Sequence, residues 1–151
     1  MFYLFLFVAS FIVAFIFYKR QRPQWKLSIL FPKEQLLYEQ SKTTVNTIGS
    51  DGVRHGMAWS CVRVTNKRIF FLYPDKKAIS KILDFSGEKQ STLDEILYRN
   101  TLYLDRVSIK VESDIRGHES FLAKAVDRNG AAVQYQFLVR ESKKLKEALD
   151  I

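Results

Sequence analysis

Residues 62–71 read Val62-Arg63-Val64-Thr65-Asn66-Lys67-Arg68-Ile69-Phe70-Phe71. Apolar residues dominate both sides of a short polar group, a pattern typical of two antiparallel strands joined by a tight turn. Asn tolerates a positive φ, and a Thr hydroxyl can bond back to the turn backbone. We therefore expect a turn at Asn66-Lys67 between strands over 57–65 and 68–73. We expect Arg68 to pair with a carboxylate across the sheet rather than with a ligand.

Further strands are predicted on both sides of this hairpin, wherever β-branched and aromatic residues alternate with polar ones. They cover residues 37–48, 78–85, 97–104, 106–112 and the two arms of a hairpin over 121–140. A glycine-rich loop over 49–56 joins the first strand to the second. Asn129-Gly130 predicts a type I′ turn in the last hairpin.

The period of the apolar residues becomes helical at the end of the chain. Leu145, Ala148 and Leu149 lie at i, i+3, i+4 spacing and predict one amphipathic helix over 140–149. About seven short antiparallel strands closed by one helix predict a mainly β barrel or sandwich.

The first eighteen residues contain no charged side chain and no proline. A run of this length is at the short end of the roughly 17–25 residues that span a hydrocarbon core, so residues 1–18 are predicted to form a transmembrane helix. A cleaved signal peptide is the alternative, but it would need a charged start, a shorter apolar core and a small-residue cleavage site. A buried core helix would show an apolar stripe rather than apolar residues on every face.

Four basic residues follow this segment closely: Lys19, Arg20, Arg22 and Lys26. They carry half of the net charge of +8, which results from 24 basic and 16 acidic residues. Basic flanks stay cytoplasmic, which predicts a single-pass protein of the cell membrane with its N-terminus outside and residues 19–151 in the cytoplasm. The flank is either a bare topology signal or a contact for anionic lipid headgroups. The single cysteine, Cys61, cannot form an internal disulfide and is expected to pack as a small apolar residue.

The chain therefore divides into a transmembrane helix over 1–18, a basic juxtamembrane tether over 19–33 and one domain over 34–151. The order of elements in this domain resembles the GRAM and bacterial PH-like families of the pleckstrin-homology superfold. The residues that match their motif are Gly56, Val62, Val64, Thr65, Asn66, Arg68, Ile69 and Phe71. Glu39 or Glu34 matches the leading acidic residue of these families. The resemblance covers 34–151 by element order and 56–71 by motif.

This resemblance implies a PH-like seven-stranded antiparallel barrel or sandwich capped by a C-terminal α-helix, which binds lipid headgroups or peptides at its open end. The basic candidates for such binding are Lys42, Arg54, Arg63, Lys67, Lys76 and Lys77, together with the four residues of the basic flank. The basic-x-basic pair of tight inositol-phosphate binders is missing, because Val64 and Thr65 follow Arg63.

No motif for catalysis, a metal or a cofactor occurs in the sequence. A modest positive charge on the domain does not call for nucleic acid. We therefore expect a membrane-anchored, non-enzymatic binding module that acts as a protein-interaction or assembly component, with weak charge-driven contact to anionic lipid. Its expected partners are the bilayer and a membrane or cytoplasmic protein. A specific, phosphoinositide-like headgroup sensor is the alternative, and a cryptic membrane-bound enzyme is a remote one.

Overall fold

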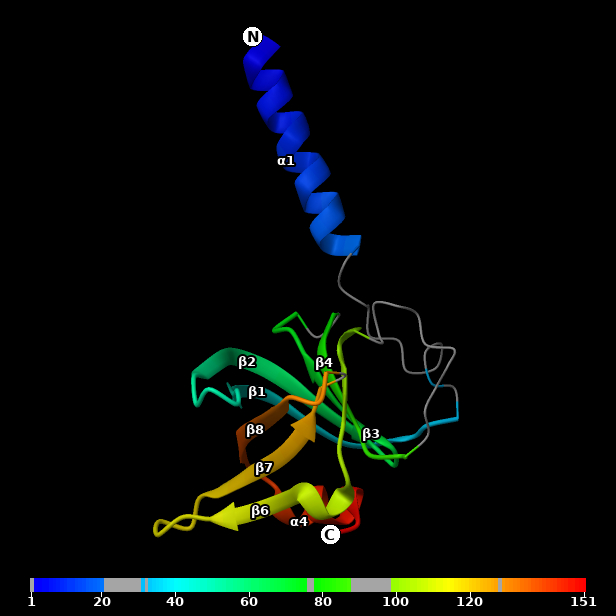
Figure 1. Ribbon diagram of the computed structural model, residues 1–151, viewed down its shortest axis with the longest axis vertical. Coiled ribbons are helices and arrows are strands. Elements are labelled where there is room, and N and C mark those ends of the chain that lie inside the picture. Colours follow the sequence, from blue (N-terminus) through cyan, green and yellow to red (C-terminus); the bar gives the residue numbers. More distant parts are fainter. Residues whose placement is uncertain (1, 21–30, 32, 76–77, 88–98, 128) are drawn as a thin grey trace.

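The computed structural model describes residues 2–20, 31, 33–75, 78–87, 99–127 and 129–151. The N-terminal helix α1, Phe2–Arg20, stands apart from a β-barrel (Figure 1). Side chains of α1 are described from Tyr3 to Phe17, Phe5 excepted. Within the described residues, no helix combines the length and the apolar character that crossing a membrane requires.

Eight strands and a C-terminal helix form the rest of the described chain (Figure 1). They are β1 Leu36–Ile48, β2 Arg54–Thr65, β3 Arg68–Leu72, β4 Ile79–Asp84, β5 Thr101–Tyr103, β6 Ile109–Ser113, β7 Glu119–Val126, β8 Ala132–Val139 and α4 Ser142–Leu149, with a 3₁₀ turn η1, Arg106–Ser108, before β6. Seven strands form a closed ring in the order β5-β4-β3-β2-β1-β8-β7, which the pair Tyr103 and Val126 completes between β5 and β7. The chain is thus a seven-stranded closed barrel with a C-terminal helix, compatible with a PH-like fold, and β6 is an additional strand on β7.

The expectation of a wholly antiparallel barrel is wrong at one place, because β4 and β5 pair in parallel. Parallel neighbours need a long crossover connection, and residues 85–100 provide one between these two strands. The predicted strand over 106–112 also begins late, because residues 106–108 form the 3₁₀ turn. In turn, β2 begins earlier than expected, at Arg54, inside the predicted glycine-rich loop.

The two predicted turns keep their positions but differ in conformation. Among the described residues of the β7–β8 hairpin, only Gly130 has a positive φ, +84°, and Asn129 does not, so the type I′ prediction is wrong. Asp127 instead accepts hydrogen bonds from the amides of Asn129 and Ala131 through its Oδ1 atom, at 2.8 and 2.9 Å. In the β2–β3 hairpin, Asn66 is likewise not left-handed.

Two apolar cores lie on opposite faces of the sheet. The larger core fills the barrel, and α4 closes it with Leu145, Ala148 and Leu149, which confirms the predicted buried face of this helix. The smaller core lies outside β2, β3 and β4 and contains the members Phe31, Cys61, Phe70, Leu72, Ile79 and Ile82. Every residue of β3 is therefore buried, which explains its uninterrupted apolar run. Cys61 packs as a small apolar residue, as predicted.

Candidate functional site

Strands β1 and β8 separate before either of them ends. Their ladder runs from Ile48 to Val45 on β1 and stops at the pair Val45 and Phe137. Beyond this point the Gln40 side chain bridges the gap: its Nε2 donates to the Leu138 carbonyl at 2.7 Å, and its Oε1 accepts the Arg140 amide at 3.1 Å. The Gln40 side-chain amide thus takes the place of the backbone hydrogen bonds that β1 no longer makes to β8. An open groove lies between the two strands at this point.

Two irregularities cause this separation. The β1–β2 register shifts on both sides of Thr43. Lys42 in β1 and Trp59 in β2 have positive φ values of 56° and 60°, a conformation that is costly for residues with a side chain. Bulges of this kind bend a strand and re-aim its side chains. Lys42 and Thr43 both line the groove, in the part of β1 that does not pair with β8.

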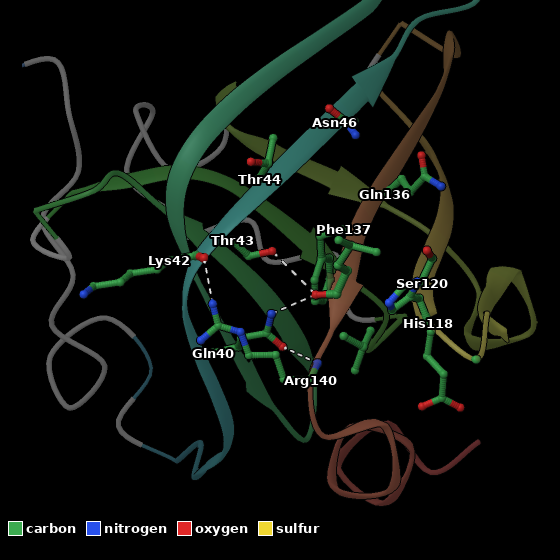
Figure 2. Close-up of a pocket in the computed structure, with 14 residues that line it drawn as sticks. Gln40, Lys42, Thr43, Thr44, Asn46, His118, Ser120, Gln136, Phe137 and Arg140 are labelled. Atoms are coloured by element: carbon green, nitrogen blue, oxygen red, sulfur yellow. Dashed lines mark hydrogen bonds between the residues drawn. The ribbon is translucent and has the colours of Figure 1, made fainter. Parts of the chain in front are cut away.

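Figure 2 shows this groove, which has a volume of about 730 Å³. Its lining includes four polar side chains from three strands: Thr44 and Asn46 from β1, Ser120 from β7 and Gln136 from β8. Within the described part of the chain, none of these four side chains forms a hydrogen bond. Hydroxyl and amide groups can both donate and accept, so the groove presents unused hydrogen-bonding capacity of both kinds.

Two of the charged groups around the groove, those of Arg140 and Glu119, are held by neighbouring groups. The Arg140 guanidinium donates from Nη2 to the Lys42 carbonyl at 3.1 Å. A hydrogen bond from Ser142 holds the pKa of the Glu119 carboxyl below its usual value, and the Nζ atom of Lys146 lies 3.7 Å from this carboxylate. The Lys42 side chain points away from the other groove residues (Figure 2). The groove is therefore lined mainly by polar, uncharged side chains, while the charged groups of Arg140 and Glu119 are held by their neighbours.

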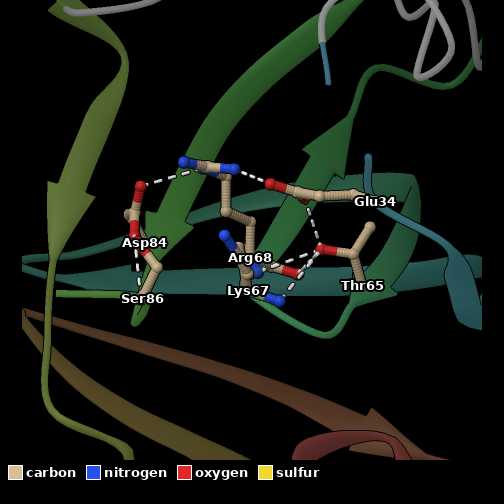
Figure 3. A network of polar contacts seen from close by, with 6 residues as sticks. All are labelled: Glu34, Thr65, Lys67, Arg68, Asp84 and Ser86. Atoms are coloured by element: carbon tan, nitrogen blue, oxygen red, sulfur yellow. Dashed lines mark hydrogen bonds and ion pairs between the residues drawn. The ribbon is translucent and has the colours of Figure 1, made fainter. Parts of the chain in front are cut away.

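A buried ion-pair network lies away from the groove, next to the β2–β3 turn (Figure 3). Arg68 is fully buried, and its Nε atom lies 2.8 Å from Asp84 Oδ2. Its Nη1 atom contacts the Glu34 carboxylate, and its guanidinium lies 4.3 Å from the centre of the Phe31 ring. The prediction that Arg68 pairs with a carboxylate is confirmed, and Glu34 is the acidic residue that meets it.

Thr65 completes this network. Its Oγ1 accepts the Arg68 amide at 3.1 Å and donates to Glu34 Oε2 at 2.8 Å. The motif that resembles the GRAM family therefore has a structural role: it ties Phe31 and Glu34, which directly precede β1, to the β2–β3 hairpin. One contact with each of two buried carboxylates, together with full burial, leaves this arginine no surface for an external ligand.

A second, smaller pocket of about 240 Å³ opens at the end of the barrel opposite α4, between β1, β2, β4 and β8. Burial lowers the pKa of the Lys81 amine and raises the pKa of Tyr135 to about 12. His55 and Ser80 also line this pocket. Among the described residues, no carboxylate pairs with Lys81, so its charge is not neutralised locally.

The predicted basic residues whose side chains are described are not gathered into one site. Arg63 is held by Glu39 at 2.6 Å, Arg54 is exposed at the start of β2, and Lys67 lies in the β2–β3 turn. Lys42 belongs to the groove lining, but its side chain points away from the other groove residues. Arg22, Lys26, Lys76 and Lys77 lie outside the described residues, as do the side chains of Lys19 and Arg20.

The groove residues were not predicted from the sequence. Thr44, Asn46, Ser120 and Gln136 occupy outward positions of strands, where polar residues are expected anyway. Nothing in the local sequence marks the place at which two strands that are distant along the chain stop pairing. The positive φ of Lys42 and Trp59 is equally invisible in the sequence, because neither is a residue type that favours it.

In the described part of the chain, no three His, Cys, Asp or Glu side chains come close enough together to hold a metal ion. Comparison of the chain with protein-family models, with curated proteins and with solved structures finds no match in any of the three.

Proposed function

We propose that this chain is a membrane-anchored binding module whose groove between β1 and β8 receives an extended segment of a partner protein. The observation that carries this proposal is the set of four unused hydroxyl and amide side chains along an open groove. An extended peptide offers alternating N–H and C=O groups, which neutral donors and acceptors can pair. A phosphorylated headgroup would instead require several converging cations, whereas the Lys42 side chain points away from the groove and the Arg140 guanidinium donates to the Lys42 carbonyl.

The anchor in this proposal is α1. Residues 2–18 carry no charge, and large apolar side chains are exposed along the helix, including Phe7, Phe11 and Phe15. Exposed apolar surface of this size marks contact with a membrane or with another protein, and it supports the proposed anchor. The positive flank after it favours a cytoplasmic barrel, and its charge supports weak contact with anionic lipid. The barrel needs no lipid specificity for recruitment if α1 already holds it at the cell membrane.

The anchor is tested by extraction of membranes from cells that express the full chain. We expect the chain to stay in the membrane fraction at alkaline pH and to be released by detergent. Replacement of Val8 and Ile12 by Lys should shift it to the soluble fraction, because each charge at the centre of a span costs about 3 kcal/mol. Recovery of the unaltered chain in the soluble fraction would contradict the anchor without bearing on the groove.

The groove is tested by photo-crosslinking in the membrane, with a photoreactive residue at Gln136 of the full chain. Lys124, which is exposed on β7 outside the groove, provides the matched control position. We expect a protein adduct from position 136 that position 124 does not give. Asn46→Leu combined with Gln136→Leu should weaken binding of that protein on the order of tenfold, because two hydrogen-bonding groups are lost. Identical products from both positions, or adducts with lipid only, would contradict the proposal.

A second candidate function rests on Lys81. Its partly buried amine has no carboxylate partner among the described residues, and His55, Ser80 and Tyr135 line the same pocket. This arrangement suits one anionic group, such as a lipid phosphate. Glycerophosphate should then raise the melting temperature of the full chain in detergent, and Lys81→Gln should abolish the effect. An unchanged melting temperature of the unaltered chain would eliminate this candidate.

A further inference from the structure

Strand β6 has a free edge. Among the described strands, it alone pairs on one side only, with β7, and Figure 1 shows it as the outermost strand. The Asp114 amide donates to the His118 carbonyl at 2.8 Å, which continues the β6–β7 ladder. Because hydrogen-bonded positions alternate along antiparallel strands, Lys110 and Glu112 direct their backbone groups to β7. Ile109, Val111 and Ser113 therefore direct theirs to the free edge.

The side chains of β6 do not guard its free edge. The apolar ones point to the barrel core and the charged ones point to solvent. Ile109 and Val111 pack on the barrel core, whereas Lys110 and Glu112 are exposed on the outer face. Across β7 these two face Leu122 and Ser120, which carry no charge. Neither Lys110 nor Glu112 forms an ion pair with a described residue. One positive and one negative side chain thus stand without a partner, two positions apart, on the same face of a free edge.

This charge pattern is self-complementary. We propose that two copies of the chain associate through β6, antiparallel, with Val111 on the two-fold axis. In this register Lys110 of each copy lies opposite Glu112 of the second copy, so two cross-strand ion pairs form. Placing either charged residue on the axis would oppose like charges, which is unfavourable. The charges therefore select one register, and a symmetric contact of this kind closes as a dimer.

Two exposed aliphatic side chains lie beyond the two ends of β6, each four positions from Val111 along the chain. Val107 is 84% exposed and Ile115 is 106% exposed, the highest values among the large apolar side chains of the barrel. The antiparallel arrangement brings the end of β6 next to Val107 in one copy toward the end next to Ile115 in the second. The dimer would thus cover apolar surface on both sides of the ion pairs, and it accounts for two side chains that the groove does not use.

The contact is small, because β6 has only five residues. Specific stable interfaces bury about 1,200 Å² or more, so we expect weak association in solution. Confinement of both copies to one membrane through α1 would raise their effective concentration. This inference goes beyond the proposed function; it rests on the proposed anchor α1, which membrane extraction tests separately, but it requires neither a partner in the groove nor a ligand at Lys81.

The register is tested with two single-cysteine variants of the full chain, Lys110→Cys and Glu112→Cys. Residues opposite each other at non-hydrogen-bonded positions have Cα atoms about 4.5 Å apart, within the range of a disulfide. A mixture of the two variants in proteoliposomes should therefore form a disulfide-linked dimer on mild oxidation. Either variant alone should not, because its two cysteines lie two residues out of register. The native Cys61 is buried and does not interfere.

Charge reversal provides the second test, with dimerisation measured by energy transfer between labelled full-length chains in liposomes. Lys110→Glu and Glu112→Lys should each weaken association on the order of tenfold, and the double reversal should restore it. Lys124→Glu, an equal charge change elsewhere on the surface, should have no effect. Circular dichroism verifies that every variant folds. A monomeric unaltered chain, a dimer that tolerates the single reversals, or crosslinks to a different protein would overturn the proposal.

Discussion

Arg68→Met removes the only positive charge in a buried network of three ionic side chains. The Arg68 side chain is 0% exposed, and the side chains of Glu34 and Asp84 are 4% and 1% exposed. The guanidinium also lies on the Phe31 ring. Met has a similar apolar length but no charge, so the substitution keeps most of the packing and leaves two carboxylates buried without a counter-ion.

The expected loss follows from the burial of both partners. Removing one member of a buried ion pair typically costs about 3–5 kcal/mol, because the remaining charge is left uncompensated. Arg68 has two such partners, and its contact with Phe31 adds about 1–2 kcal/mol for a desolvated cation on an aromatic ring. We therefore expect the free energy of unfolding to fall by about 5 kcal/mol, a large part of the total for a domain of this size.

Arg63→Met is the matched control. Arg63 lies five residues earlier and also pairs with a carboxylate, Glu39, at 2.6 Å, but these side chains are 14% and 36% exposed. Pairs of this kind contribute about 0–1 kcal/mol. Urea unfolding of the full chain in detergent, followed by circular dichroism, gives both values under the same conditions.

The network can also be neutralised as a whole. The triple variant Glu34→Gln, Arg68→Met, Asp84→Asn should recover at least half of the loss, because no buried charge remains. If Arg68→Met is no more destabilising than Arg63→Met, or if the triple variant is less stable than Arg68→Met alone, the reasoning from buried charge is refuted.

Three further predictions concern other parts of the barrel. Burial raises the pKa of Tyr135 to about 12; its unfolded value is near 10, so folding favours the protonated phenol, and up to about 2.7 kcal/mol of stability should be lost as the pH rises from 10 to 12. Urea titrations at pH 9 to 12 should show this loss, and Tyr135→Phe should abolish it. Lys42 has a positive φ, so Lys42→Gly should change the free energy of unfolding by less than about 1 kcal/mol. Lys42→Val should lower this free energy by about 2 kcal/mol more. Equal effects of the two substitutions would exclude backbone strain at this position. Leu145 is fully buried under the barrel, so Leu145→Ala should cost about 2–5 kcal/mol in the same unfolding assay, and the exposed Lys144→Ala should cost less than about 0.5 kcal/mol.

Much of the local structure could be predicted because it depends on short-range patterns. The two strands around Thr65 and Arg68 alternate strongly, and they form β2 and β3 close to the expected bounds. The buried face of α4 follows from the helical spacing of Leu145, Ala148 and Leu149. In both places the period of apolar residues matches the period of the element, so no distant contact was needed to identify it.

The turn conformations were harder to predict. Gly130 takes the left-handed conformation that its residue type favours, but the side chain of Asp127 stabilises a different turn from the expected one. Asn66 stays right-handed because Thr65 already satisfies the amides of Lys67 and Arg68. Residue preference alone does not decide between turns when a neighbouring side chain can supply the hydrogen bonds.

The sequence by itself determined the uncharged first segment, the positions of most strands, the closing helix and the pairing of Arg68 with a carboxylate, but not which carboxylates these are. Only the tertiary structure decided the groove, the parallel β4–β5 pair and the free edge of β6. Gln40 and Leu138, which meet beneath the groove, are 98 residues apart. The physical reason is that burial repeats with the local geometry of each strand, whereas the point at which two strands stop pairing depends on register, bulges and closure of the whole barrel.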